Sequence, residues 1–537
     1  MGRAALAWLE RPRRGVSAAL LFGGVASLLR GVDTNWDLRN YHFYDPWAWL
    51  NGRLYWDYAP AQIQSYHNPL VDLPFFALAQ SGLPAFAVTF LMGFPFGLAV
   101  YFFYRIARFA TADLDVQREG PALLVIGLVA LTGAAGLSQI GSTMNEWATA
   151  ALVLGALLVL VRAVRDTGAP MAPAAAIAGL CCGIATGLKL TAAIYPIALF
   201  GSFVLCFRGR RGFARATIVL AAAMAAGFVA AYGYWGIVLW ERFRNPFFPY
   251  FNGVFRSEYW EPTSFFDTKF RPAKAIHWLT LPFGLAERNR LTSENDLRDP
   301  RLALLCVFAI VLFVSLVQAS RASGERLRTL VARAMPPSVR LLAVFAAFSY
   351  VVWLGVFTIY RYTIPLELIA SLLLVLAMHS AFAGAVRRDA LVATFSALVV
   401  AVTMAPYWGR APLHAGRYID VAVPPVAADS LVMIMSGQPL AYVVPFIDSG
   451  ARVIAPSSNF TNPRFDNRLQ REMAALIAGQ RGPMYLIQYL DRVDPAEEST
   501  LAAYGLRRAA EGCRQIRSNL EENRRLGLCA LSRQEPR

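Results

Sequence analysis

Long apolar runs recur along the first 406 residues of the chain, and short polar stretches separate them. A helix needs about 20 residues to cross a hydrocarbon core about 30 Å thick. Runs of this kind begin near Val16, Pro84, Pro121, Trp147, Met171, Leu190, Thr217, Arg301, Leu341, Pro365 and Leu391. The pattern predicts a polytopic α-helical membrane protein with about eleven spans.

The pattern changes from Tyr407 onward, where the apolar runs become short and alternate with polar segments. "SLVMIMSG", "ARVIAP" and "MYLIQYL" are typical of buried strands, whereas "NRLQREMAALIAG" and "PAEESTLAAYG" have helical spacing. We therefore divide the chain into a membrane module, residues 1–406, and a soluble α/β domain, residues 407–537. Within the membrane module, residues 33–83 and 241–300 form two large polar loops.

Arginine positions predict the orientation, because cytoplasmic loops collect Lys and Arg near the ends of spans. Arg11, Arg13 and Arg14 precede the first apolar run, and every second loop after it is basic. This alternation places the N-terminus in the cytoplasm and both large loops outside. We expect a multi-pass membrane protein whose C-terminal domain is periplasmic or extracellular. We expect the first run to be a retained anchor, and a cleaved signal sequence is the alternative.

Composition agrees with a membrane location. The chain is 56% hydrophobic and 16% charged, whereas soluble domains are about half apolar and a quarter charged. Its net charge of +16 comes largely from the inner loops. We attribute this excess to topology and to contact with anionic membrane lipids, and we expect no nucleic-acid partner.

Two of the six cysteines, Cys513 and Cys529, lie in the predicted external domain. An external compartment can oxidise such a pair, so we predict a disulfide between them. The other four cysteines fall in apolar runs and are expected to serve packing.

Candidate chemistry gathers on the predicted outer face. The segment after the first span contains Asp33, Asp37, Tyr41 and His42, and Asp37 and Tyr41 are spaced to share a helix face. An aromatic belt at the membrane interface explains many of the rings in this segment, but it does not explain the carboxylates.

Further charged residues stand at the outer ends of spans: Glu146 in "STMNEW", Lys189 in "GLKLT" and Arg361 in "YRYTIP". Helix capping is an alternative role for Glu146, and snorkelling is an alternative for the cations. A carboxylate can take the proton from an attacking hydroxyl, and cations can stabilise a departing phosphate. Together these types predict group transfer from a lipid-linked phosphate to a hydroxyl or amine.

These motifs resemble the glycosyltransferase-C superfamily, near the dolichyl-phosphate-mannose protein mannosyltransferases and the bacterial lipid A aminoarabinose transferases. "WDLRNYH" is similar to the acidic first-loop motif, and "STMNEW" to the second acidic position. "GLKLTAAIYP" resembles the Gly-Lys hairpin, "NPFFPYFN" an outer-loop motif, and "RYTIP" an Arg-Tyr pair near the donor phosphate. Asp37 is followed by Leu38 where the mannosyltransferases have a second acid, so Asp33 remains an alternative base.

The resemblance implies inverting transfer of a sugar from a polyprenyl-phosphate donor to a lipid, glycan or protein acceptor at the outer face of a bacterial inner membrane. Asp37 would act as the base, and Lys189 and Arg361 would hold the phosphate. The further candidates are Glu146, His42 and Asp33 for catalysis, and Tyr41, Tyr362, Asn245 and Asn68 for substrate binding. No cofactor is required on this view. A divalent metal bridging Asp37 and Glu146 is an alternative that we do not favour.

Two other functions fit the same topology. A transporter or lipid flippase would use the acids as ion or substrate sites, although transporters place such groups at mid-membrane and often in repeated halves. A noncatalytic envelope assembly protein would use the outer domain to bind a partner, and would tolerate loss of the Asp37 charge.

Overall fold

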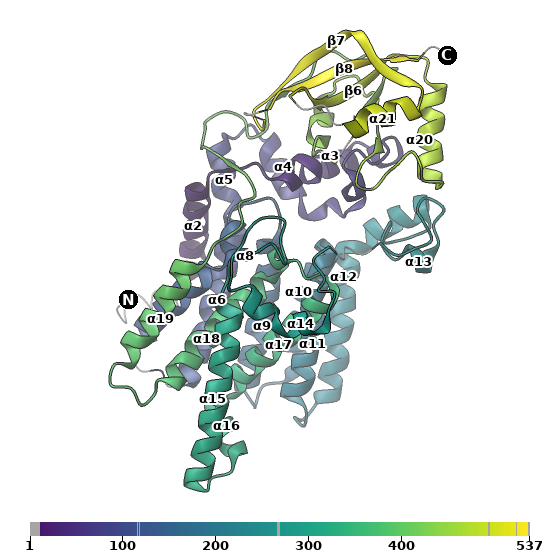
Figure 1. Cartoon of the computed structure of the whole chain (residues 1–537). Coiled ribbons are helices and arrows are strands. Elements are labelled where there is room, and N and C mark those ends of the chain that lie inside the picture. The colour runs from purple at the N-terminus through teal and green to yellow at the C-terminus, as the bar shows by residue number, and fades with distance from the viewer. Residues whose placement is uncertain are drawn as a thin grey trace.

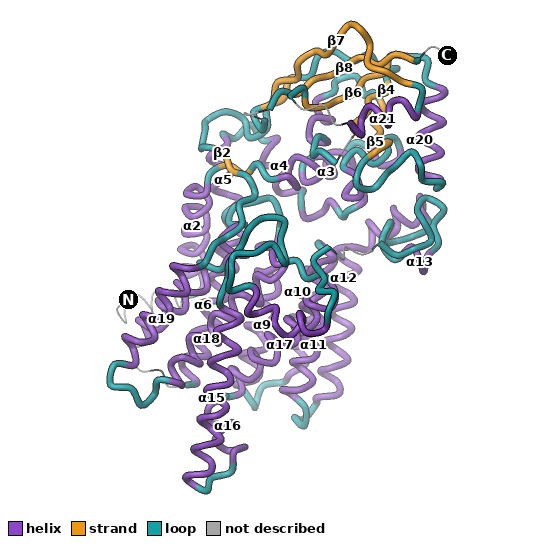
Figure 2. The backbone as a smooth tube through the Cα atoms, in the orientation of Figure 1, coloured by secondary structure: helices purple, strands orange, loops and turns teal. Residues whose placement is uncertain are grey.

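The fold is a helical bundle with a β-sheet domain at one end, as the computed structural model shows for residues 11–114, 116, 119–265, 269–435, 437–491, 495–521 and 524–534 (Figure 1). Nearly all the strands gather at the same end of the bundle (Figure 2). The predicted polytopic helical fold with a C-terminal α/β domain is confirmed.

Helices form at every predicted apolar run. The bundle consists of α2 (Pro12–Arg30), α5 (Ala85–Met92), α6 (Phe94–Asp113), α7 (Glu119–Leu131), α9 (Glu146–Arg165), α10 (Met171–Leu188), α11 (Ile194–Phe207), α12 (Phe213–Phe243), α15 (Arg301–Ser323), α17 (Pro337–Val356), α18 (Ile364–Ala381) and α19 (Arg388–Val402).

Eight spans among the described residues are long and apolar enough to cross a membrane, which makes this a multi-pass membrane protein. The sequence pattern predicts about eleven. The difference lies in three helices: α2 begins with two arginines, and α7 and α19 have only 13 and 15 residues.

Glycines bring α10 and α12 into close backbone contact. Gly179, Gly183 and Gly187 recur every fourth residue of α10, so they lie on one face of the helix. A Cβ atom added at Gly183 would lie 2.1 Å from the carbonyl oxygen of Met224 on α12. Small residues at this spacing let two membrane helices approach closely. Because Lys189 follows the last glycine by two residues, this packing fixes the point where its side chain leaves the bundle.

The loop at residues 33–83 folds into short helical segments above the bundle. Asp37 immediately precedes a π-helical turn, Leu38–His42, which is followed by α3 (Tyr44–Leu50) and later by α4 (Leu73–Gln80). Turns of π-helix are rare and occur frequently at functional sites. The other large loop contains the short helices α13 (Asn252–Phe255) and α14 (Ala275–Gly284).

The C-terminal sheet has the strand order β3-β7-β8-β6-β4-β5. Three neighbouring strands, β4 (Leu431–Met435), β5 (Arg452–Ser457) and β6 (Met484–Tyr489), are parallel, and β5 is the edge strand. These strands and the helices α20 (Arg468–Gly479) and α21 (Pro495–Ala503) confirm the five elements expected from the sequence. The sequence analysis did not identify the antiparallel strands β3 (Val421–Ala422), β7 (Leu506–Ser518) and β8 (Leu526–Arg533).

The sheet domain shares a hydrophobic core with the 33–83 loop. Leu38, Phe43 and Tyr44 are buried in one cluster with Tyr442 and Val443 of the domain. Backbone pairing joins the two parts as well, since β1 (Val32–Asp33) pairs with β2 (Arg410–Ala411). The loop and the domain are therefore packed as one body above the bundle.

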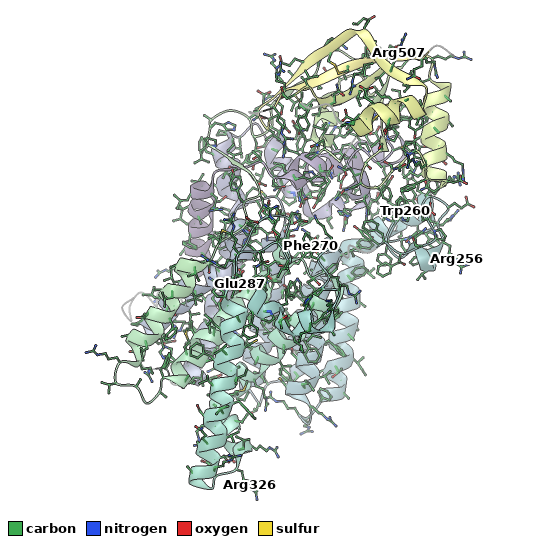
Figure 3. The ribbon with its side chains drawn as sticks, viewed as in Figure 1. Arg256, Trp260, Phe270, Glu287, Arg326 and Arg507 are labelled. Atoms are coloured by element: carbon green, nitrogen blue, oxygen red, sulfur yellow. A yellow bond between two sulfur atoms is a disulfide. The ribbon has the colours of Figure 1, made fainter. Side chains whose placement is uncertain are left out.

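The predicted cytoplasmic loops can be located relative to the sheet domain. Arg326 lies at the tip farthest from the sheet, whereas Arg256 and Trp260 lie on the side facing it (Figure 3). Away from the sheet, Arg165 pairs with Asp113 at 2.7 Å, and the guanidinium of Arg210 donates to the carbonyl oxygen of Ala163. The loops that the arginine pattern assigns to one side of the membrane thus meet at one end of the bundle.

Cys513 and Cys529, the predicted pair, form a disulfide between neighbouring positions of β7 and β8.

Candidate active site

Asp37 and Arg361 meet between the first loop and the bundle. The Arg361 Nη1 atom lies 3.0 Å from Asp37 Oδ2. Arg361 stands in a short 3₁₀ turn, Tyr360–Thr363, directly before α18, and its guanidinium also lies 5.7 Å from the ring centre of Trp408. Both residues were predicted from the sequence to lie on the same face of the membrane, and in the structure they are in contact.

The surroundings keep the Asp37 carboxyl ionised. Asp37 is only 6% exposed, and burial by itself raises a carboxyl pKa. The positive charge of Arg361 is the largest of the opposing effects, which together outweigh burial, so the net pKa of Asp37 is lowered. Asp37 is therefore a carboxylate at neutral pH.

A second ion pair joins Lys189 and Glu146. The Lys189 ammonium donates to Glu146 Oε1 and to the carbonyl oxygen of Met144, both at 2.5 Å. It also lies 5.9 Å from the ring centre of Tyr362, the neighbour of Arg361. Both predicted cations thus border the same aromatic ring, because Arg361 lies 5.4 Å from it.

His42 is held by Asp72 and lies beside Tyr41. Its Nδ1 atom is 2.6 Å from Asp72 Oδ1, which also accepts a hydrogen bond from the Asn145 amide at 2.5 Å. The rings of Tyr41 and His42 are 4.0 Å apart. Burial, and next the charge of Asp37, raise the pKa of Tyr41 well above its usual value, so its hydroxyl stays protonated. Asp72 orients the imidazole and leaves Nε2 as its remaining polar atom.

His67 and Tyr250 were not identified from the sequence. His67 Nε2 lies 3.0 Å from the Tyr250 hydroxyl, and the His67 ring packs edge-on against Tyr41 at 5.4 Å. Burial, and next the charge of Lys189, lower the pKa of His67 to about 4, so it is neutral at pH 7. The sequence offered one indication of His67, which is that it lies in the same polar segment as Asp37.

Three buried polar atoms of this cluster have no hydrogen-bond partner within the described residues: His42 Nε2, Glu146 Oε2 and Arg361 Nε. Such atoms are costly in a folded protein, and most buried polar groups are paired. Two of them belong to cation-bearing or potentially cationic groups and one to a carboxylate. A ligand with both an anionic group and hydroxyl groups would satisfy all three.

Asp33 has a structural role. Its Oδ2 atom accepts hydrogen bonds from the Asn35 amide at 2.6 Å and from the Thr143 backbone and hydroxyl at 2.8 and 2.9 Å. Asp33 is fully buried and ties the first loop to the turn before α9. Because its carboxylate is occupied in this way, the alternative base assignment is not supported.

Asn68 and Asn245 also hold the backbone rather than line the cluster. The Asn68 amide donates to the carbonyl oxygens of Gly187 and Ala231, both at 2.8 Å, and its side-chain oxygen accepts from a backbone N–H two residues on. The Asn245 side chain bonds within its own loop, to Tyr250 and Phe247 among others. The N–H groups of both amides are thus engaged by protein acceptors.

A buried ionic cluster at the bundle end escaped the sequence analysis. Arg301 pairs with Asp299 at 2.9 Å and donates to the carbonyl oxygen of Val129. Glu367 accepts backbone hydrogen bonds from the start of α8 (Ala134–Ser138) at 2.8 and 2.9 Å. These charges satisfy the ends of α7 and α8, so they stabilise the fold.

The two acids proposed to bridge a metal are each paired with a cation instead. Arg361 lies against Asp37, and Lys189 lies against Glu146. Within the described ranges, no group of three or more His, Cys, Asp or Glu side chains is arranged to hold a metal ion. The donor set therefore does not fit a bridging metal.

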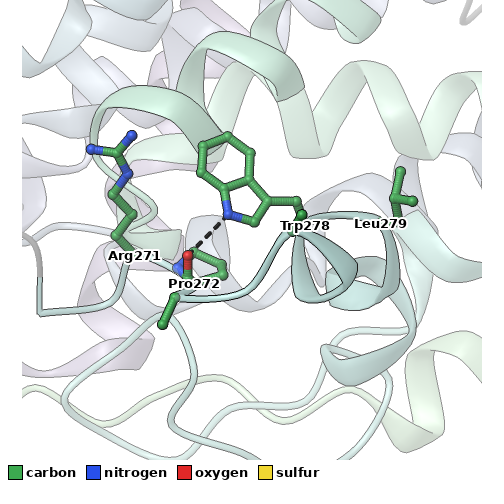
Figure 4. Close-up of a pocket in the computed structure, with 6 residues that line it drawn as sticks. Arg271, Pro272, Trp278 and Leu279 are labelled. Carbon is green, nitrogen blue, oxygen red and sulfur yellow. Dashed lines mark hydrogen bonds between the residues drawn. The ribbon is translucent and has the colours of Figure 1, made fainter.

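A separate hollow of about 750 Å³ lies in the second large loop, where Arg271 and Trp278 face each other (Figure 4). The Trp278 indole donates to the carbonyl oxygen of Pro272 at 2.9 Å. None of the predicted site residues lines this hollow.

No protein-family model matches the sequence, and no curated protein matches it significantly. Among solved structures, the crystal structure of ArnT from Cupriavidus metallidurans in the apo state is similar to this chain. The two share 15% sequence identity, the comparison covers 98% of each chain, and the TM-score is 0.40. The function proposed below rests on this chain's own residues.

Proposed function

We propose that this protein is a membrane glycosyltransferase that moves a sugar from a polyprenyl-phosphate donor to an acceptor, with inversion at the anomeric carbon. One observation supports this most strongly. An ionised carboxylate, Asp37, is in contact with a cation, Arg361, and a second cation, Lys189, lies near the same ring of Tyr362. A base and phosphate-binding groups are thereby combined at one end of a membrane bundle.

Asp37 takes the proton from the acceptor hydroxyl or amine. The acceptor atom attacks the anomeric carbon, and the bond from that carbon to the phosphate oxygen breaks. The bonding electrons pass to the phosphate, which leaves as polyprenyl phosphate with one more negative charge. Since phosphate is a good leaving group, no general acid is needed.

Arg361 serves the base and the leaving group together. Its planar guanidinium offers five N–H donors, of which Nη1 binds Asp37 and Nε has no partner among the described residues. As Asp37 accepts a proton it loses its charge, while charge builds on the phosphate. The attraction of Arg361 then shifts toward the phosphate, which stabilises the transition state.

Lys189 is the second phosphate ligand. Lys189 directly follows α10 and carries its ammonium group on a flexible side chain. Glu146, the first residue of α9, holds this ammonium group. Glu146 would position it, and its unpartnered Oε2 atom would accept a sugar hydroxyl. Tyr41 and His42 would contribute further hydrogen bonds to the sugar or the acceptor, and Tyr362 would pack against the donor. No metal is required in this scheme.

The reaction would take place on the non-cytoplasmic face of a bacterial inner membrane. The arginine-rich loops lie at the opposite end of the bundle from Asp37, and cytoplasmic loops are enriched in Lys and Arg. The disulfide in the C-terminal domain also favours an oxidising compartment for this end.

The test is a transfer assay on the purified chain in lipid nanodiscs with a panel of radiolabelled polyprenyl-phosphate sugars. We expect release of polyprenyl phosphate and transfer of label with at least one donor. The same donors, incorporated into proteoliposomes with the protein, distinguish a transferase from the two alternative functions. Translocation of intact donor without cleavage would support a flippase, and absence of both activities would support an assembly role.

A further inference from the structure

A second hollow lies at one end of the strands of the C-terminal sheet. It has a volume of about 450 Å³, within the range of small-molecule sites. Its lining includes Asp491, Gln515, Arg517, Glu521, Arg524 and Arg525. At this end of the sheet, β6 and β7 end and β8 begins. We call it the β6 hollow.

The β6 hollow lies just beyond the carboxyl end of β6, which pairs in parallel with β4. Ligands of open α/β sheets bind outside the carboxyl ends of the strands. Asp491 follows the carboxyl end of β6 by two residues.

The charges of the β6 hollow are only partly compensated. Arg525 is paired with Asp491 at 2.7 Å. Arg524 lies 4.9 Å from the ring centre of Tyr489, and across the described part of the chain neither Arg524 nor Arg517 has an ion-pair partner. Two guanidinium groups in one polar hollow favour an anion, because their fork of donors matches phosphate and carboxylate.

The hollow is linked to the candidate active site through its own lining. Glu521 Oε1 accepts hydrogen bonds from Arg39 Nη1 at 2.7 Å and from the Tyr489 hydroxyl at 2.8 Å. Arg39 stands on the same π-helical turn that follows Asp37. A molecule held in the β6 hollow would therefore contact Glu521, which binds the turn that follows the proposed base.

We propose that the β6 hollow binds the phosphate or carboxylate of an anionic saccharide, and that this saccharide is the acceptor. The acceptor assignment rests on the proposed transferase function, whereas the binding itself does not. The polar lining and the two guanidinium groups of Arg517 and Arg524 favour a hydrophilic, charged molecule over an acyl chain.

The first test measures binding by calorimetry on the full chain in nanodiscs of zwitterionic lipid. Glucose 6-phosphate and glucuronic acid are the anionic probes, and glucose and inorganic phosphate are the comparisons. We expect both anionic sugars to bind, and to bind more tightly than either comparison. Equal binding of inorganic phosphate and glucose 6-phosphate would overturn the saccharide assignment. Absence of binding by every probe would overturn the site.

Variants locate the binding. The double variant Arg517→Gln, Arg524→Gln should weaken it at least tenfold, since it removes two charged hydrogen-bond donors to the anion. Arg507→Gln, an exposed position at the opposite end of β7, is the matched control and should have no effect (Figure 3). Asp491→Asn should tighten binding, because it removes a repulsive charge and frees Arg525. Equal affinities for the double variant and the control would refute the proposal.

Two further experiments test whether the saccharide is free or part of a lipid, and whether it is the acceptor. Vesicles containing phosphatidylinositol 4-phosphate present the same chemistry as a lipid headgroup, and flotation compares them with the soluble sugar. In the transfer assay the double variant should raise the KM for the acceptor and leave that for the donor unchanged. An unchanged acceptor KM would overturn the acceptor role. If the wild type transfers no sugar, the proposed function fails, and the calorimetry still decides whether the hollow binds anionic saccharides.

Discussion

The Nη1 atom of Arg361 lies 3.0 Å from Oδ2 of Asp37, although 324 positions separate the two residues in the chain. Asp37 comes from the loop above the first helix, and Arg361 comes from the turn before α18. The contact joins the loop that follows α2 to the turn that precedes α18. It places a proton acceptor beside a group suited to hold a phosphate.

The pH dependence of the reaction tests this contact. Burial raises the pKa of Asp37, and the positive charge of Arg361 is the largest effect that lowers it. The net pKa lies below the usual value for a carboxyl group, so loss of kcat/KM through protonation of Asp37 should set in at lower pH in the wild type than an ordinary Asp would give. In Arg361→Gln the burial effect is less opposed, and the acidic limb should move to higher pH. An Arg361→Gln profile that coincides with the wild type in shape would contradict the assignment.

Lys189 should contribute to donor binding. We expect Lys189→Gln to raise the KM for the donor and to lower kcat, because the ammonium is proposed to stabilise the leaving phosphate. The KM for the acceptor should stay unchanged. Glu146→Gln leaves the ammonium in place, and its effect should be smaller and partly redundant with that of Lys189→Gln in a double-mutant cycle. Strictly additive effects would indicate that the pair does not act as a unit.

Asp33 should matter for folding. Replacing it with Asn weakens several buried hydrogen bonds, so we expect a loss of about 1–3 kcal/mol of stability and a lower Tm. The activity of the protein that remains folded should stay within a few-fold of the wild type. A large fall in kcat at unchanged Tm would return Asp33 to the role of base.

The disulfide should stabilise the sheet domain. Replacing Cys513 and Cys529 together with Ser removes a crosslink between positions 16 residues apart. The chain-entropy model gives a loss of about 3 kcal/mol for a loop of this size. A reducing agent should lower the Tm of the wild type and leave that of the double variant unchanged. Cys306→Ser, a free cysteine in α15, serves as control.

Much of the fold could be predicted because its physical causes are local. Spans of about 20 apolar residues and alternating strands leave a periodic record in the sequence, as "MYLIQYL" and β6 illustrate. β7 was missed because it is mostly exposed and carries many arginines, so its apolar residues do not alternate. α7 and α19 match apolar runs, but their helices are too short for the spans expected there.

The site was predicted in part for a similar reason. Residue type and membrane side identified Asp37, Glu146, Lys189 and Arg361, and those properties follow from the sequence alone. Pairing between residues is a tertiary property. Nothing in the sequence indicated that Asp33 would be enclosed by Thr143, that Asn68 would bind backbone carbonyls, or that His67 would reach Tyr41. The shared core of the first loop and the sheet domain was hidden for the same reason.

The most direct measurement is the single-turnover rate of sugar transfer for Asp37→Asn with saturating donor and acceptor. Asn keeps the size of the side chain but cannot accept the acceptor's proton, and general base catalysis contributes about 10²–10⁴-fold. We predict a fall of that size, with donor affinity changed by much less and the protein folded as judged by its Tm. A rate within threefold of the wild type would contradict the assignment of Asp37 as the base.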